Sequence, residues 1–171
     1  GFNNHADGTD LEIEFCMAQV KPDGTATEGI ERYDLGQASW TSTAFDNTVK
    51  PATQWDPNNY INMWVAKLDG GILGYAQFPS NSQLPGMNTN GGSALNDGVV
   101  IGSGTVGSVA NPGYGAPYNL GRTLTHEVGH WIGLRHIWGD ANCGDDFCAD
   151  TPESPTLAPT LLTPLVVPVG I

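Results

Sequence analysis

Four short stretches of the chain have the residue pattern of β-strands. In them, apolar residues alternate with polar ones or β-branched residues predominate, which is typical of strands with one buried face. The stretches are Leu11–Gln19, Tyr60–Leu68, Ile72–Phe78 and Gly98–Val106. Turn-forming residues follow the first two, at 21–24 and 69–71. We therefore expect four strands joined by turns and by polar, glycine-rich loops at 79–97 and 107–119.

One stretch has the pattern of a helix. Between Arg122 and Leu134, apolar residues recur at spacings that place them close to one helical face. Asn119, just before it, is a residue type that often caps a helix N-terminus. After Asp140 the chain is irregular and rich in proline, and we expect loops there.

Charge excludes two classes of partner. The chain has 171 residues, the size of one compact domain, and a net charge of −12 with only six Lys and Arg residues. Nucleic acids and anionic membranes require clustered cations, so we expect neither as a partner. The excess of carboxylates fits a secreted protein and calcium binding, although a solvated acidic surface would look the same. We expect a monomer.

Residues 126–136 read H-E-V-G-H-W-I-G-L-R-H. His126 and His130 are one helical turn apart on one face, where two imidazoles can hold one metal ion. Zinc bound there would lower the pKa of a coordinated water to about 7, and Glu127 would act as its general base.

Gly133 and His136 extend this motif. Glycine adopts the left-handed conformation that ends a helix without steric cost, so the chain can bring His136 back to the metal. Three His ligands leave a fourth position open, as catalytic zinc sites require. The alternatives are two unrelated histidines on a helix, or a distant Glu as third ligand. The longer motif disfavours both.

Several segments resemble the metzincin clan of zinc peptidases, and within it the pappalysin/cytophagalysin family. They include L-E-I-E-F-C-M-A at 11–18, G-G-I-L-G-Y-A-Q-F-P at 70–79, G-R-T-L-T-H-E-V-G-H-W-I-G-L-R-H-I-W-G-D at 121–140 and D-D-F-C-A-D-T-P at 145–152. The resemblance covers about residues 11–153, and 154–171 form an atypical tail.

The resemblance implies an α/β (α+β) fold in one catalytic domain, residues 1–171. That fold has a twisted, mostly parallel five-stranded sheet, an active-site helix and a loop-rich C-terminal part. It also implies that Gly74, Tyr75 and Ala76 belong to an edge strand. An extended polypeptide substrate would pair with this strand.

The chain departs from the family pattern in two places. A methionine turn and a tyrosine usually follow the zinc motif, whereas Met17, Met63 and Met87 all precede it and no Tyr follows Tyr118. The family also has a strand and a helix before the segment that matches Leu11. We therefore expect the catalytic domain to be incomplete at both ends.

The resemblance also implies a calcium site in the acidic loop after the helix. Asp146 and Thr151 are the candidate ligands, with the backbone carbonyl of Ala149. An acidic loop without metal is the alternative. Cys143 and Cys148 could form a disulfide with each other or, as in the family, with other cysteines. A second zinc site at these cysteines is disfavoured because His136 is already committed.

Two functions from different classes remain. The first is a secreted zinc endopeptidase that hydrolyses peptide bonds through a zinc-activated water, with Glu127 as base. The second is a non-catalytic zinc-binding fragment or protein-binding module derived from such an enzyme. The presence of Glu127 favours the first, and the missing methionine turn favours the second.

Overall fold

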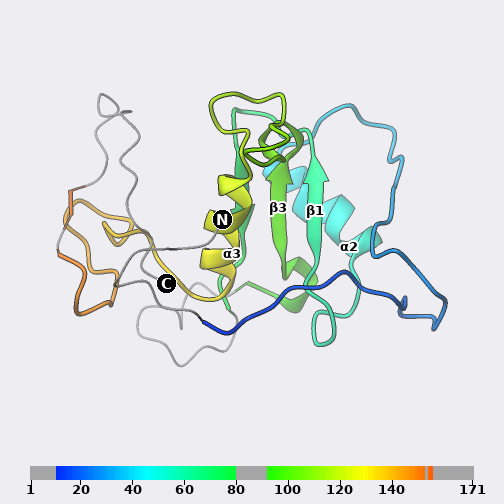
Figure 1. Ribbon diagram of the computed structural model, residues 1–171, viewed down its shortest axis with the longest axis horizontal. Coiled ribbons are helices and arrows are strands. Elements are labelled where there is room, and N and C mark those ends of the chain that lie inside the picture. Colours follow the sequence, from blue (N-terminus) through cyan, green and yellow to red (C-terminus); the bar gives the residue numbers. More distant parts are fainter. Residues whose placement is uncertain (1–10, 80–91, 153, 156–171) are drawn as a thin grey trace. The chain divides into compact units, whose positions relative to one another are not determined.

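The computed structural model describes residues 11–79, 92–152 and 154–155 (Figure 1). The chain forms two compact units. Of the described residues, those between 32 and 155 belong to one unit and 11–31 belong to the other. The expectation of a single domain over residues 1–171 stays a prediction. The tail from 156 and Met87 lie outside the described residues.

The described part of the smaller unit corrects one prediction, because Leu11–Gln19 forms no strand. Alternation shows that a segment can occupy a sheet edge, but a strand also needs a hydrogen-bonded neighbour. This segment has no strand paired with it among the described residues. At its end the Gln19 carbonyl accepts the Thr27 amide at 3.0 Å, and Ile13 and Phe15 are about half exposed. The turn that follows is confirmed, since the Gly24 amide donates to the Lys21 carbonyl at 2.9 Å.

The larger unit contains a three-stranded sheet with the order β1-β3-β2. The strands lie within three of the predicted stretches: β1 Met63–Ala66, β2 Gly74–Ala76 and β3 Val99–Gly102. β1 runs parallel to β3, and β2 runs antiparallel to it with Tyr75 opposite Val100. The α+β class is confirmed. The described residues hold three strands rather than five, and one of the two pairings is parallel.

A helical segment that the sequence did not predict covers one face of this sheet. It consists of α1 Ser42–Ala44, the π-helical turn η1 Phe45–Val49 and α2 Lys50–Thr53. The Thr41 hydroxyl caps it by accepting the Ala44 amide at 3.2 Å. Phe45 and Val49 pack with Trp40 and Val100 in the buried core. Short 3-10 turns, η2 Ala94–Asn96 and η3 Ser103–Thr105, precede and follow β3.

The predicted helix is α3, Arg122–Trp131, and it lies on the opposite face of the sheet (Figure 1). Successive residues of β2 show this arrangement. The Tyr75 hydroxyl donates to Asp46 of η1 at 2.9 Å, whereas the α-carbon of Gly74 faces Glu127 of α3. The sheet is therefore covered by helices on both faces.

The two ends of α3 differ in how well the sequence predicted them. Gly121, with a φ of 80°, is the N-cap, so the expectation of Asn119 was wrong. The side-chain Nδ2 of Asn119 instead donates to the Gly113 carbonyl at 2.8 Å and shapes the preceding loop. At the other end Gly133 has a φ of 108°, as expected for a helix-terminating glycine.

Within the described ranges, no helix has both the length and the apolar character needed to cross a bilayer.

Candidate metal centre

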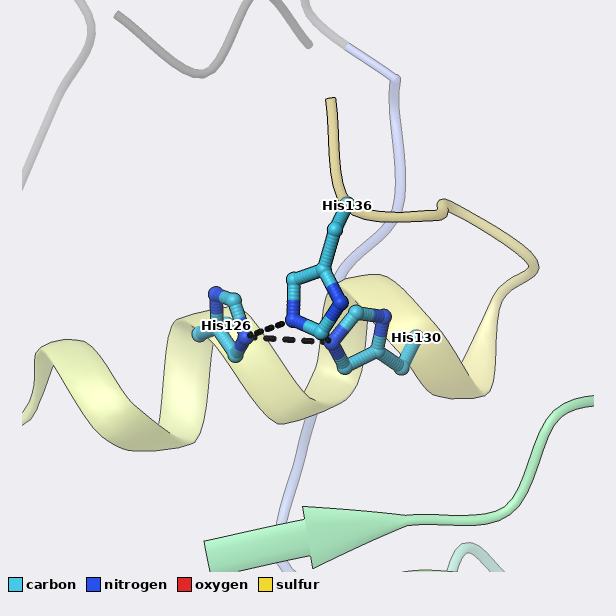
Figure 2. A group of neighbouring side chains, drawn as sticks. All are labelled: His126, His130 and His136. Atoms are coloured by element: carbon cyan, nitrogen blue, oxygen red, sulfur yellow. Dashed lines mark hydrogen bonds between the residues drawn. The ribbon is translucent and has the colours of Figure 1, made fainter. Parts of the chain in front are cut away.

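The end of α3 brings three histidines together. His126 and His130 lie one turn apart on the helix, and His136 lies on the segment that follows Gly133 (Figure 2). The Gly133 amide donates to the His130 carbonyl at 3.0 Å, and the Leu134 amide donates to Gly129 at 2.9 Å. These bonds close the helix and return the chain toward its own face, which positions His136 beside the other two rings.

The Nε2 atoms of the three rings meet at one point. The distance from His130 to His126 is 3.0 Å, and both other distances are 3.2 Å. Zinc–nitrogen bonds of 2.0–2.1 Å in a tetrahedral site require nitrogens about 3.4 Å apart, which is close to the observed spacing. Among the described residues, no other group of three or more His, Cys, Asp or Glu side chains is arranged to hold a metal ion.

Hydrogen bonds at the far side of two rings set which nitrogen faces inward. The Nδ1 atom of His130 lies 2.7 Å from the Leu134 carbonyl, and that of His136 lies 2.6 Å from Asp140 Oδ1. Each Nδ1 donates to an oxygen, so each Nε2 directs a lone pair to the meeting point. Such inward lone pairs repel one another unless a cation lies between them, so the donor set fits a metal ion.

Asp140 is a functional residue that the sequence analysis missed. The sequence analysis named it only as the residue after which the chain becomes irregular, whereas its carboxylate holds His136. Its position four residues after the third histidine was the available signal.

Aromatic rings also fix the imidazoles. The indole of Trp138 stacks on His136 with ring centres 4.4 Å apart and planes within 5° of parallel. Phe78 meets His130 edge-on at 5.3 Å. These contacts restrict ring rotation before any ligand binds.

Glu127 is buried at the inner side of this cluster, with 7% of its surface exposed. Burial raises the pKa of its carboxyl from 4.5 to about 7. Burial also lowers the pKa of His126 to about 4 and lowers that of His130. Both imidazoles are therefore neutral near pH 7, which is the form that binds metals.

A cleft of about 300 Å³ joins the histidines to the edge of the sheet. Glu127, Asp140 and the β2 residues Gly74, Tyr75 and Ala76 line it together with the three rings. The Leu73 carbonyl accepts the Gly102 amide and the Gln77 amide donates to Gly98, so odd-numbered residues bond to β3. The peptide groups of Gly74 and Ala76 consequently face away from β3, at the free edge.

In the acidic loop, the hydrogen bonds that the structure describes for Asp146 and Thr151 are local. The Asp146 carboxylate accepts the Cys148 amide at 3.0 Å, and the Thr151 amide donates to the Cys148 carbonyl at 3.0 Å. These bonds bring Asp146, Ala149 and Thr151 into one short turn region without gathering three acidic side chains. Cys143 and Cys148 are exposed free thiols.

Comparison with known proteins identifies relatives of the chain. Residues 44–161 match the peptidase M43 family, described as pregnancy-associated plasma protein-A. The chain is 38% identical over 115 residues to extracellular metalloprotease 1 of Coccidioides posadasii, which covers 67% of this chain and 38% of that protein. It is 36% identical over 141 residues to an extracellular metalloprotease of Arthroderma otae, with 78% and 47% covered.

Solved structures of mirolysin agree with this assignment. The structure of mature mirolysin from Tannerella forsythia with a cleaved peptide has a TM-score of 0.71 and 39% identity, over 86% of this chain and 53% of that one. Mirolysin with a compound bound gives a TM-score of 0.65 and 41% identity, with 81% and 50% covered. The chain thus spans about half the length of the relatives it matches. It belongs to the peptidase M43 family of metzincin-type metalloproteases.

Proposed function

We propose that the protein is a secreted zinc-dependent endopeptidase. The observation that carries the proposal is the convergence of three Nε2 atoms next to a buried carboxylate, in a cleft bounded by a free strand edge. Relatives named extracellular metalloproteases support secretion and proteolysis, and mirolysin with a cleaved peptide supports a polypeptide substrate.

His126, His130 and His136 would hold the zinc ion, with Asp140 and the Leu134 carbonyl fixing two of the rings. Bound zinc supplies Lewis-acid polarisation of the scissile carbonyl and a water acidified to a pKa of about 7. Glu127 would act as the general base, because its pKa, raised to about 7 by burial, suits it to take up a proton in the cleft and to pass it to the leaving amine.

The substrate would bind as an extended strand. The peptide groups of Gly74 and Ala76 offer a donor and an acceptor each at the free edge of β2, and Tyr75 between them keeps β2 paired with β3. Backbone pairing of this kind recognises an unfolded segment whatever its side chains are. A peptide bond of the paired segment would then lie over the histidine cluster, in the same cleft.

We further propose one calcium ion in the loop after α3, with ligands from Asp146, Thr151 and the Ala149 carbonyl. The net charge of −12 and the clustering of oxygen donors on an irregular loop support it. Calcium there would stabilise the loop that carries Asp140 and, through it, His136.

A non-catalytic zinc-binding module is the second candidate. The buried Glu127 with its raised pKa favours the enzyme, because a module that only binds zinc has no use for a poised base.

A proteolysis assay separates the two candidates. We expect the zinc-loaded protein to cleave unfolded casein, and Glu127→Ala to lower kcat by about 10²–10⁴-fold with zinc still bound. Glu14→Ala, an exposed glutamate outside the cleft, is the matched control and should retain full activity. Cleavage that survives either Glu127→Ala or 1,10-phenanthroline would exclude this mechanism.

A further inference from the structure

Lys50, the first residue of α2, is buried against the sheet on the face opposite α3. Its side chain is 2% exposed, and its Nζ lies 2.8 Å from Asp46 Oδ1 and donates to the Asn96 carbonyl at 3.1 Å. The same Nζ lies over two aromatic rings, 4.8 Å from the centre of Tyr75 and 5.5 Å from that of Trp64. One ammonium group thus contacts β1 through Trp64, β2 through Tyr75 and the turn before β3 through Asn96.

A hydrogen-bonded network of Lys50, Asp46 and Tyr75 connects this group to β2. Lys50 and the Tyr75 hydroxyl both bond to Oδ1 of Asp46, the hydroxyl at 2.9 Å. Burial and the bond to Asp46 raise the pKa of Tyr75, so its hydroxyl stays protonated and keeps donating at neutral pH. Tyr75 is the middle residue of β2, so the network holds that strand at its centre.

β2 has few other contacts that would fix its position. It is three residues long, and in the described sheet it pairs only with β3. The backbone bond just beyond it, from the Gln77 amide to the Gly98 carbonyl, is 3.3 Å long. On the face of α3, Gly74 contributes no side chain. Because so short a strand is held weakly by its own backbone bonds, its position depends on Tyr75.

Stability alone does not account for this network. Removing Lys50 from water carries a desolvation penalty, and apolar side chains of similar volume often stabilise a core as well or better. Charged hydrogen bonds differ from apolar contacts in that they are satisfied in one geometry. Asp46 is 30% exposed and lines a cavity of about 230 Å³ along β2, so its carboxylate can turn to solvent when the network is broken. The intact network therefore favours one position of Tyr75.

We propose that Lys50 and Asp46 are positioning residues for the substrate, because through Tyr75 they hold the free edge of β2 in place to pair with an extended chain. The proposal rests on the peptidase function proposed above. The three histidines and Glu127 would act on the peptide bond, whereas the network on the opposite face of the sheet sets how tightly the chain is bound. Loss of the network should weaken substrate binding and leave the metal centre unchanged.

Peptide binding to the zinc-loaded Glu127→Ala protein tests this role without cleavage. Fluorescence anisotropy with a labelled, unstructured casein peptide gives Kd. Tyr75→Phe keeps the ring over Lys50 but removes the hydroxyl, and it should raise Kd by about three- to tenfold, the range for loss of one hydrogen bond. Lys50→Met releases Asp46 and should raise Kd in the same range. Zinc affinity, measured by competition with a chelator, should be unchanged in both variants.

Two controls in the same background separate positioning from stability. Tyr33→Phe removes the same hydroxyl from a half-exposed tyrosine outside both cavities. Thr41→Ala removes the cap of α1, so it destabilises the same helical segment without touching Lys50, Asp46 or Tyr75. Both should keep the Kd of the parent protein, while calorimetry shows a lower thermal midpoint for Thr41→Ala. If Thr41→Ala raises Kd as much as Tyr75→Phe does, the network only stabilises the fold and the positioning role is overturned.

Kinetics with Glu127 present distinguish failure of the network from failure of the peptidase. Tyr75→Phe should raise KM for the casein peptide by the factor found for Kd and leave kcat unchanged. Cleavage with unchanged KM and Kd in both network variants would exclude the positioning role and leave the peptidase function. No cleavage, together with the expected rise in Kd, would exclude the peptidase function and leave the positioning role. A parallel fall in kcat and zinc affinity would show that the network acts on the metal centre, against the proposal.

Discussion

Asp140 shows how a single side chain prepares the metal centre. Its Oδ1 lies 2.6 Å from Nδ1 of His136, the one histidine of the cluster that is not on α3. Asp140→Asn keeps an acceptor oxygen but removes the charge, so we expect zinc affinity to fall by about 10–100-fold. Competition with a chromophoric chelator measures this change. Asp34→Asn removes one exposed carboxylate elsewhere, and an equal loss in that variant would refute the orienting role.

Burial of Glu127 predicts a pH dependence of the metal-free protein. Because its folded pKa of about 7 exceeds the ordinary 4.5, folding favours the protonated carboxyl. Its contribution to stability is complete below pH 4.5 and is lost as the pH rises through 7, by about 3 kcal/mol in total.

Glu127→Gln removes this titration. Urea unfolding from pH 5 to pH 8 should therefore show the variant gaining free energy of unfolding relative to the wild type as the pH rises. His126, whose folded pKa is lowered to about 4, titrates in both proteins and cancels in the comparison. A difference that does not vary with pH would show that the carboxylate is solvated in the folded state.

At the scale of elements, the contact between β2 and α3 leaves no room for a side chain at Gly74. A Cβ there would lie 2.9 Å from the Val100 carbonyl and 3.0 Å from Glu127 Cγ. We expect Gly74→Ala to lower the free energy of unfolding by about 1–3 kcal/mol and to reduce kcat by displacing Glu127.

Gly129→Ala is the matched control for that substitution. Its added Cβ would make an ordinary contact of 3.7 Å with Leu134, inside α3, where alanine favours the helix over glycine. Urea denaturation should show this variant to be as stable as the wild type or more so. The prediction for Gly74 fails if both variants have the same stability.

Elements were predictable where a local pattern decides the structure. Apolar spacing and Gly133 predicted α3 and its end, because both act within a few residues. The helix from Ser42 to Thr53 was missed because β-branched residues, Pro51 and a π-turn weaken the helical period. Leu11–Gln19 was wrongly predicted because pairing depends on a distant neighbour, which no local pattern encodes.

The same distinction applies to the metal centre within the whole molecule. The three histidines and Glu127 could be named from one eleven-residue motif. That motif says nothing of β2, whose place at an edge was expected only from the family resemblance. The cavity around Asp46 was not expected at all, because it depends on strand order and on the unpredicted helix. The cleft wall opposite the histidines thus comes from a part of the chain far from the motif.

The acidic character of the molecule leads to a prediction about calcium. The loop after α3 has little regular structure, and Asp140, Cys143 and Phe147 adopt positive φ angles within it. A cation that binds only the folded loop stabilises the whole protein by mass action. We expect EGTA, with zinc resupplied, to lower the thermal midpoint by about 5–10 °C, measured by calorimetry.

Substitution of one proposed ligand shows whether that shift comes from this loop. Asp146→Asn removes the carboxylate charge while an amide oxygen can still accept the Cys148 amide, so the local turn is preserved. Its midpoint should already be low and should no longer respond to EGTA, whereas Asp34→Asn should respond as the wild type does. A full EGTA response in Asp146→Asn would place the calcium elsewhere. No response in the wild type would show that the protein has no stabilising calcium site.

Because Asp140 belongs to the same loop and holds His136, calcium loss should also weaken zinc binding, which the chelator competition can measure directly.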